Sequence, residues 1–129
     1  VLAEAKTGCY DSMAVTRGLP ADIKQRYFQK DRQHWTERWQ LRDDVRRRVQ
    51  FTQANLLASY SKLGRFDVIF CRNVLIYFSS ASKVDILKRM AATLNPGGYL
   101  FLGASEALTQ YSDDFEMVRC NPGVVYKKK

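Results

Sequence analysis

Two apolar runs with an amphipathic stretch between them predict a strand, a helix and a second strand in the later half of the chain. Residues 66–71 (FDVIFC) and 99–105 (YLFLGAS) are short, continuous and rich in β-forming residues, as is typical of buried strands. Between the two runs, apolar residues recur at helical spacing: Val84, Leu87, Met90 or Ala91, and Leu94. Ser79 or Ser80 can cap the start of this helix, and NPGG at 95–98 ends it. The pattern predicts a βαβ unit in a parallel sheet covered on both faces.

Shorter elements are expected around this unit. The segments FEMVRC and VVYKKK flank NPG and predict a hairpin at the sheet edge, over 115–129. In the first half of the chain, the pattern predicts the end of a helix closed by Gly8, a short helix beginning near Pro20, a strand over 34–41, one helical turn with Val45 and Val49, and a strand over 49–55. In the strand over 34–41, alternation places Trp35, Glu37, Trp39 and Leu41 on one face.

The composition narrows the class of protein. A chain of 129 residues with 46% hydrophobic content can bury one sizeable core, so a single domain is the default. It contains no apolar run of membrane-spanning length and no signal-peptide pattern, and we therefore expect a cytoplasmic protein. The three cysteines form no C-x-x-C pair and are expected to be reduced, mostly buried thiols. With a single histidine, His34, and no cluster of ligands, no metal site is expected.

Positive charge is concentrated in one segment. The chain has a net charge of +8, and residues 24–48 contribute five of these charges, from nine Lys and Arg against four Asp and Glu. We call residues 24–48 the basic segment. Such a field favours an anionic partner, which can be an acidic protein helix, nucleic acid or a membrane surface, and a solvated face without a partner is an equally good interpretation.

Polar residues follow three of the predicted strands. Asn55 ends the first, Arg72 and Asn73 follow the second, and Ser105 and Glu106 follow the third. Each of these residues alone can be explained as a helix cap or a turn residue. Because ligands of open α/β sheets bind beyond the carboxyl ends of the strands, the three together favour a binding site.

The segments FDVIFCRNVLIYF (66–78) and NPGGYLFLGASE (95–106) resemble the signature of the CheR family of chemotaxis receptor methyltransferases. The resemblance covers essentially residues 1–129. It implies an α/β fold, namely the Rossmann-like sheet of class I methyltransferases. It also implies that S-adenosylmethionine is the methyl donor, that S-adenosylhomocysteine is the product, and that methyl esters form on glutamate side chains of receptor helices.

The same resemblance implies roles for individual residues. In the family, the asparagine of the NLL segment and the asparagine and valine of RNV lie at the cofactor, which here gives Asn55, Leu56, Asn73 and Val74. The tyrosine of IYF lies near the transferred methyl group, which here is Tyr77, and the alternative for Tyr77 is an ordinary core aromatic with its hydroxyl at the surface. We assign Arg72 and Ser105 to substrate binding. Since glutamate is ionised near neutral pH, its oxygen can attack a sulfonium methyl group without a general base or a metal.

The chain also departs from the family's pattern. It has no G-x-G-x-x-G loop and lacks the acidic residue expected after the second strand, so we expect the carboxyl-terminal part of a catalytic domain with a sheet incomplete at its N-terminus. An exposed sheet edge would follow, and with it a homodimer formed by edge pairing. A small β-rich insert is expected over 9–42 and lacks the glycine-rich turn that grips a receptor's tethering peptide, so dependence on a tether is not expected.

Two other functions stay open at this point. The first is a non-catalytic interaction module that keeps the fold and does not use Asn55 and Asn73. The second is a nucleic-acid binder in which Trp35 and Trp39 stack on bases. It is the less favoured, because HWTERWQL alternates like a packed strand.

Overall fold

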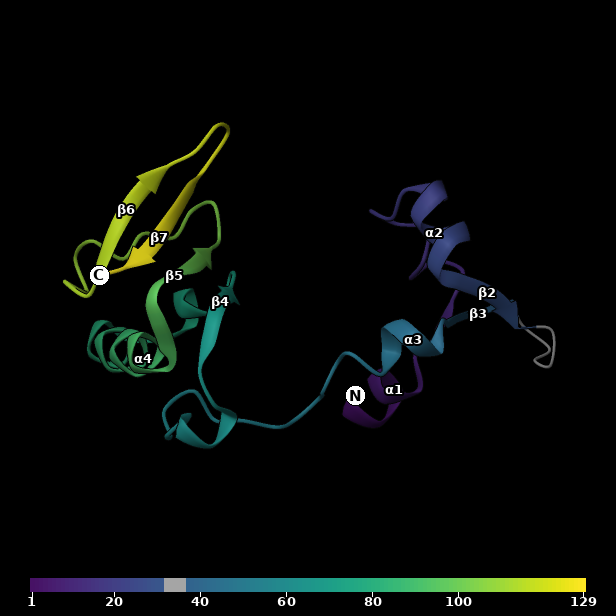
Figure 1. Ribbon diagram of the computed structural model, residues 1–129, viewed down its shortest axis with the longest axis horizontal. Coiled ribbons are helices and arrows are strands. Elements are labelled where there is room, and N and C mark those ends of the chain that lie inside the picture. The colour runs from purple at the N-terminus through teal and green to yellow at the C-terminus, as the bar shows by residue number, and fades with distance from the viewer. Residues whose placement is uncertain (32–36) are drawn as a thin grey trace. The chain divides into compact units, whose positions relative to one another are not determined.

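The computed structural model describes residues 1–31 and 37–129 and divides the chain into two compact units, Val1–Gln53 and Ala54–Lys129 (Figure 1). Trp35, His34 and the start of the strand predicted over 34–41 lie outside the described residues.

The first unit is built around a small antiparallel sheet. Strand β3 lies between β1 and β2 and pairs antiparallel with both, with Gln40 opposite Cys9 and Leu41 opposite Phe28. The elements of this unit are α1 (Leu2–Thr7), β1 (Cys9–Asp11), α2 (Ala21–Tyr27), β2 (Phe28–Asp31), β3 (Arg38–Leu41) and α3 (Asp43–Arg46). Three predictions are confirmed: the helix ending at a left-handed Gly8 with φ 65°, the helix after Pro20, and a strand at 38–41.

The strand predicted over residues 49–55 is wrong. These residues have no regular secondary structure, and Val49 is 49% exposed. A strand exists only where a neighbouring strand supplies hydrogen-bond partners, and no strand in the described part of the chain pairs with this segment. Asn55 therefore does not lie at a strand end.

The second unit contains a mixed sheet of four strands in the order β4-β5-β7-β6. Strands β4 and β5 are parallel and joined by helix α4, which confirms the predicted βαβ unit, while β7 pairs antiparallel with β5 and β6. The elements are η1 (Ser61–Leu63), β4 (Phe66–Cys71), η2 (Leu75–Tyr77), α4 (Ser80–Thr93), β5 (Leu94–Leu102), β6 (Phe115–Arg119) and β7 (Val124–Lys128). The predicted hairpin around NPG is confirmed, and its β6 strand forms the sheet edge.

Helix α4 begins and ends close to where its sequence signals predict. The Ser79 hydroxyl oxygen accepts a hydrogen bond from the N–H of Ser82, as an N-cap does, and the helix ends at Thr93, just before NPGG. Its buried face packs on β5 and the hairpin in a core that includes Ile86, Leu87, Leu100 and Tyr126. The strand after the helix starts earlier than expected, at Leu94, and takes in the NPGG segment.

Strand β4 is less buried than its apolar sequence predicts. Its Ile69 and Cys71 pack toward the core, but Phe66, Val68 and Phe70 alternate with them, and Phe70 is 70% exposed. Successive side chains of a strand point to opposite faces, and within the described residues one face of β4 stays open. The strand also lies at the edge of the sheet. Among the described residues, no helix is long and apolar enough to cross a membrane.

Candidate functional site

The carboxyl ends of β4 and β5 lie side by side, because the two strands are parallel and Cys71 is opposite Leu102. The chain leaves β4 through Arg72, Asn73 and Val74 into η2, and it leaves β5 through residues 103–106. We call these two segments the strand-end loops. Two predicted positions, Arg72–Asn73 and Ser105–Glu106, are thus brought to the same edge of the sheet.

The Glu106 carboxylate joins the two strand-end loops. Its Oε2 accepts hydrogen bonds from the N–H of Asn73 and the N–H of Gly103, both at 2.8 Å. Asn73 has a left-handed backbone with φ 59°, the only such non-glycine residue in the described parts of the chain. A Cβ atom at Gly103 would clash with the Asn73 side-chain oxygen and lie 2.8 Å from Glu106 Oε2. The loops therefore fit together with no room for a side chain at position 103.

The environment of Glu106 favours its ionised form. Desolvation raises the pKa of the carboxyl group, but the backbone N–H groups of Asn73, Gly103, Ile76 and Leu75 together lower it below its ordinary value. The other oxygen, Oε1, is buried and has no partner of ordinary hydrogen-bond geometry among the described residues.

An apolar cleft of about 380 Å³ lies beside β4. Its lining includes two residues predicted to bind the cofactor, Leu56 and Val74, together with Tyr60, Phe70 and Met90. The Tyr60 hydroxyl donates a hydrogen bond to the Leu56 carbonyl oxygen, which ties the segment before η1 to the cleft. A volume in this range is typical of small-molecule sites, which are mostly apolar with few polar groups.

Asn55 has a local structural role at the entrance to this segment. Its side-chain oxygen accepts a hydrogen bond from the N–H of Leu57 at 3.0 Å, and its carbonyl accepts one from the N–H of Ala58 at 3.0 Å. This is the hydrogen bonding of an Asx turn, in which a short polar side chain replaces a backbone partner. The turn directs Leu56 toward the cleft.

The remaining predicted residues lie around the strand ends but in different hollows. Arg72 lines a concavity of about 440 Å³ together with Glu106 and Tyr126. Ser105 lines another, of about 220 Å³, with Ile76 and Glu106. Tyr77, the last residue of η2, is 82% exposed. Glu106 is the residue that borders both hollows.

The closest geometry of the site belongs to Glu106, which the sequence marked as a strand-end residue without assigning it a role, and to Gly103, which the sequence did not single out. The signal for Glu106 was present, since it follows an apolar run in the same way as Asn73 does. Gly103 carries no signal beyond being a glycine at a strand end. A side chain is excluded at position 103 only because Asn73, which is distant in sequence, packs against it.

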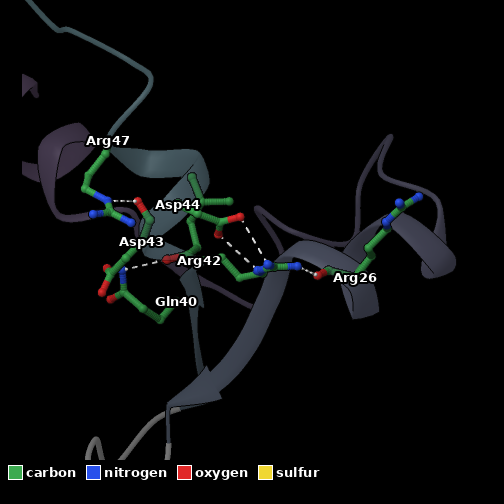
Figure 2. A network of polar contacts seen from close by, with 7 residues as sticks. Arg26, Gln40, Arg42, Asp43, Asp44 and Arg47 are labelled. Atoms are coloured by element: carbon green, nitrogen blue, oxygen red, sulfur yellow. Dashed lines mark hydrogen bonds and ion pairs between the residues drawn. The ribbon is translucent and has the colours of Figure 1, made fainter.

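Part of the basic segment is engaged within the first unit (Figure 2). Arg42 makes two 3.0 Å contacts with the Asp44 carboxylate and donates to the Arg26 carbonyl oxygen at 3.3 Å. Arg46 pairs with Asp43 at 3.0 Å and donates to the Thr7 carbonyl oxygen, also at 3.0 Å. These two arginines connect α3 to α1 and α2. Their contacts within the unit therefore explain their presence without a binding partner.

Lys24 and the three cysteines are further groups with possible chemistry. The Lys24 ammonium lies 4.1 Å from the centre of the Trp39 ring, a cation–π contact. Cys9, Cys71 and Cys120 are free thiols; Cys71 is buried, while Cys9 is partly exposed and Cys120 exposed. In residues 1–31 and 37–129, no group of three or more His, Cys, Asp or Glu side chains is placed to hold a metal ion.

Comparison with known proteins identifies relatives of the chain. It is 53% identical to the chemotaxis protein methyltransferase Cher2 of Pseudomonas putida, 52% to chemotaxis protein methyltransferase 1 of Pseudomonas aeruginosa and 52% to chemotaxis protein methyltransferase 1 of Vibrio cholerae. Each match covers 100% of this chain and 46% of the relative, so the chain spans about half the length of these relatives.

The family comparison matches residues 1–124 to the description "CheR methyltransferase, SAM binding domain". The parallel β4–α4–β5 unit and the mixed four-stranded sheet are consistent with part of a class I methyltransferase fold, as predicted from the sequence. The match covers nearly the whole chain, and the chain belongs to the CheR methyltransferase SAM-binding domain family.

Proposed function

We propose that this chain is part of an S-adenosylmethionine-dependent methyltransferase that forms methyl esters on glutamate side chains of chemotaxis receptors. The observation that supports this proposal best is the pair of strand-end loops, which place Asn73, Val74 and Tyr77 at one edge of a parallel strand pair in a chain of this family. Ligands of parallel sheets bind at this edge.

The apolar cleft fits part of the cofactor. Leu56 and Val74 line it and would hold the cofactor's apolar parts, and the proposed polar contacts are Asn55 and Asn73, their neighbours in sequence. When bound, S-adenosylmethionine supplies an electrophilic methyl group on a positively charged sulfur. The chain has no glycine-rich G-x-G-x-x-G loop of its own, so we expect the isolated 129 residues to bind the cofactor weakly.

The protein's task in this reaction is to position groups and exclude water. A substrate glutamate is already ionised, so no residue needs to remove a proton from it. We assign Tyr77 to the wall beside the transferred methyl group, and Arg72 and Ser105 to contacts with the substrate. Holding the carboxylate in line with the methyl group in a partly desolvated site supplies the rate enhancement.

The proposed partners are acidic receptor helices, recognised through the basic segment. Charge complementarity of this kind speeds association and orients the partner. The side chains of Lys24 and Arg26, on α2, supply positive charge in addition to that of Arg42 and Arg46. We place the protein in the cytoplasm, where its three free cysteines fit a reducing environment.

The experiment that tests the proposal restores the length of the relatives. The 129 residues replace the corresponding residues of the Pseudomonas putida protein, and transfer of radiolabelled methyl groups to receptor-containing membranes is measured with the chimera and its Asn73→Ala variant. S-adenosylhomocysteine binding is measured by calorimetry. We expect an active chimera that binds the product, and a variant at least ten times weaker in both assays.

The same experiment separates the enzyme from a non-catalytic module of the same fold. A chimera that folds but neither binds S-adenosylhomocysteine nor transfers methyl groups would reject the proposed function. Equal binding of S-adenosylhomocysteine by the chimera and by its Asn73→Ala variant would reject the proposed cofactor site. Methyl transfer by the chimera would then still test the proposed activity.

Edge pairing between two chains is proposed for the isolated 129 residues. Strand β4 is an edge strand with Phe66, Val68 and Phe70 exposed, and such an edge is a template for another strand. Sedimentation velocity would show a dimer that Val68→Lys disrupts. A monomer at all concentrations tested would reject it.

A further inference from the structure

We propose that Glu106 is a positioning residue for methyl transfer: its carboxylate holds the strand-end loop after β4 in the one arrangement that presents Asn73, Val74 and Tyr77. This inference rests on the proposed function for its consequence, but the contact itself is a property of the fold. Glu106 acts through other residues and needs no contact with the substrate.

The first support is the pair of hydrogen bonds. One carboxylate oxygen accepts two backbone N–H groups at 2.8 Å, from Asn73 and from Gly103. Because the acceptor is ionised, these bonds are stronger than bonds between neutral groups. Glu106 and Asn73 are separated by 33 residues, so the bond closes a long loop rather than a local turn. The carboxylate therefore fixes the two strand-end loops to each other.

The second support is the backbone of Asn73. A left-handed conformation is uncommon for residues other than glycine; asparagine tolerates it better than most, and the surroundings of Asn73 favour it further. The surroundings here are Glu106 on the amide and the Gly103 backbone against the side chain. Removing the carboxylate leaves Asn73 free to return to an ordinary conformation, which turns its side chain and the following residues.

The third support is the link to Tyr77. Leu75 and Ile76 line the same hollow as Glu106, and they belong to the short η2 helix that ends at Tyr77. Leu75 is buried and anchors the helix to the core, while Tyr77 is exposed. Since η2 follows Asn73 and Val74 directly, we expect a shift of this loop to change the direction of Tyr77.

The charged groups around Glu106 are few. Cys71, on β4, has a pKa raised by burial and by the Glu106 charge. Arg72 and Lys83 each line a hollow that Glu106 also borders, and no ion pair between either of them and Glu106 occurs in the described chain. The backbone amides are therefore the main partners of this carboxylate.

The test compares three substitutions in the chimera with the Pseudomonas putida relative. Glu106→Gln keeps the size and one acceptor oxygen, Glu106→Ala removes the contact, and Glu116→Ala removes an exposed glutamate on β6 as the matched control. We expect kcat to fall about tenfold with Gln and about a hundredfold with Ala, as misplacement of a reacting group by ~1 Å produces. The control should keep the kcat of the unsubstituted chimera.

A combination with Tyr77→Phe separates positioning from a general loss of stability. If Glu106 acts through the loop that carries Tyr77, Glu106→Gln lowers kcat by a smaller factor in the Tyr77→Phe background than alone. A purely structural role predicts equal factors in both backgrounds, and that result would overturn the proposal. Wild-type kcat in Glu106→Gln would overturn it as well.

Hydrogen exchange tests the role of Glu106 without depending on catalysis. Hydrogen exchange of the Asn73 and Gly103 amides should be at least ten times faster in Glu106→Gln than in the unsubstituted protein. Unchanged exchange rejects the proposed hold on the loops. An inactive unsubstituted chimera would refute the proposed function, whereas an active one with an unimpaired Glu106→Gln variant would refute only this inference, so the two failures are distinguishable.

Discussion

Residues 1–53 and 54–129 each form a sheet with helices, but they are stabilised in different ways. In the first unit, the helices have no buried residue, and the buried hydrophobic side chain among the described residues is Val15. In the second unit, twelve buried residues form one continuous core around α4 and β5. The first unit instead shows hydrogen bonds from arginines to backbone carbonyls of neighbouring helices.

The difference follows from the two kinds of sequence pattern. Long apolar runs and an amphipathic helix can bury a large area, at roughly 25 cal/mol per Å². Short elements rich in arginine cannot do so, and exposed ion pairs contribute about 0–1 kcal/mol each. We therefore expect the second unit to supply most of the stability of the isolated chain.

The two units can be followed by different probes. Both tryptophans lie in residues 1–53, so fluorescence reports the first unit, whereas thiol labelling of Cys71 reports the second.

The largest effect is expected from truncation of the core of the second unit. Leu100→Ala removes a fully buried side chain and should lower the free energy of unfolding by about 2–5 kcal/mol. Urea unfolding, followed by the labelling of Cys71, measures this loss. Val15→Ala is the counterpart in the first unit, and it should lower the free energy of unfolding by about 2 kcal/mol or less. If Leu100→Ala shifted the tryptophan transition equally, the two units would unfold together and the contrast would not hold.

The next largest effect is expected at Gly103. In Gly103→Ala, the new Cβ meets Asn73 and Glu106, and relief of this overlap should cost about 1–3 kcal/mol. Gly123→Ala is the matched control, because a Cβ there has no heavy atom within 4 Å. Thermal unfolding of both variants checks the prediction. Equal melting temperatures would show that the strand-end loops have room to move apart.

A smaller effect is expected from the helix caps, which also differ between the units. The Ser79 hydroxyl accepts from the N–H of Ser82 at 3.2 Å, whereas α1, α2 and α3 have no side-chain N-cap hydrogen bond. Ser79→Ala should cost ~1 kcal/mol. Urea unfolding followed by circular dichroism measures it, with Ser80→Ala as a control inside the helix. A larger loss in the control would contradict the assignment of the cap.

Arg42→Met should have a still smaller effect, in the first unit. The Arg42 side chain is 46% exposed, so loss of its contacts with Asp44 and Arg26 should cost about 0.5 kcal/mol. Tryptophan fluorescence during urea unfolding would detect the change, which should shrink in 1 M salt because of screening. Arg47→Met is the control, since Arg47 donates to the Asp43 carbonyl of its own helix. A salt-independent loss would indicate packing by the arginine stem instead of charge.

The smallest and most specific effect is a pH dependence at Glu106. Its pKa is lowered in the folded protein, so its stabilising contribution is present above the ordinary value of 4.5 and is lost as the pH falls through the folded value. The stability difference between the protein and Glu106→Gln should be constant near neutral pH and shrink below 4.5. Unfolding curves between pH 3 and 7, about the range over which carboxyl groups titrate, measure it. A difference that grows on acidification would contradict the lowered pKa.

The regular elements of the second unit were predictable because their signals are local. Apolar runs, a serine cap and the NPGG stop act within a few residues, and they predicted β4, α4 and β5, although β5 covers Leu94–Leu102 instead of the predicted 99–105. The strand over 49–55 was predicted wrongly, because alternation describes a chain that can pair but does not supply its partner. The burial of β4 was overestimated for the same reason, since cover for Phe70 must come from other segments.

The sequence by itself determined the family and the parallel strand pair, because these depend on motifs and on the order of elements, and it supplied the residues that we propose for the cofactor. The tertiary structure decided where these residues lie and what they contact. It showed that Asn55 stabilises a turn, that Arg72 and Ser105 line different hollows, and that Glu106 joins two loops 33 residues apart. Local patterns cannot contain such contacts, because a hydrogen bond between distant residues exists only once the parallel strands have placed their ends together.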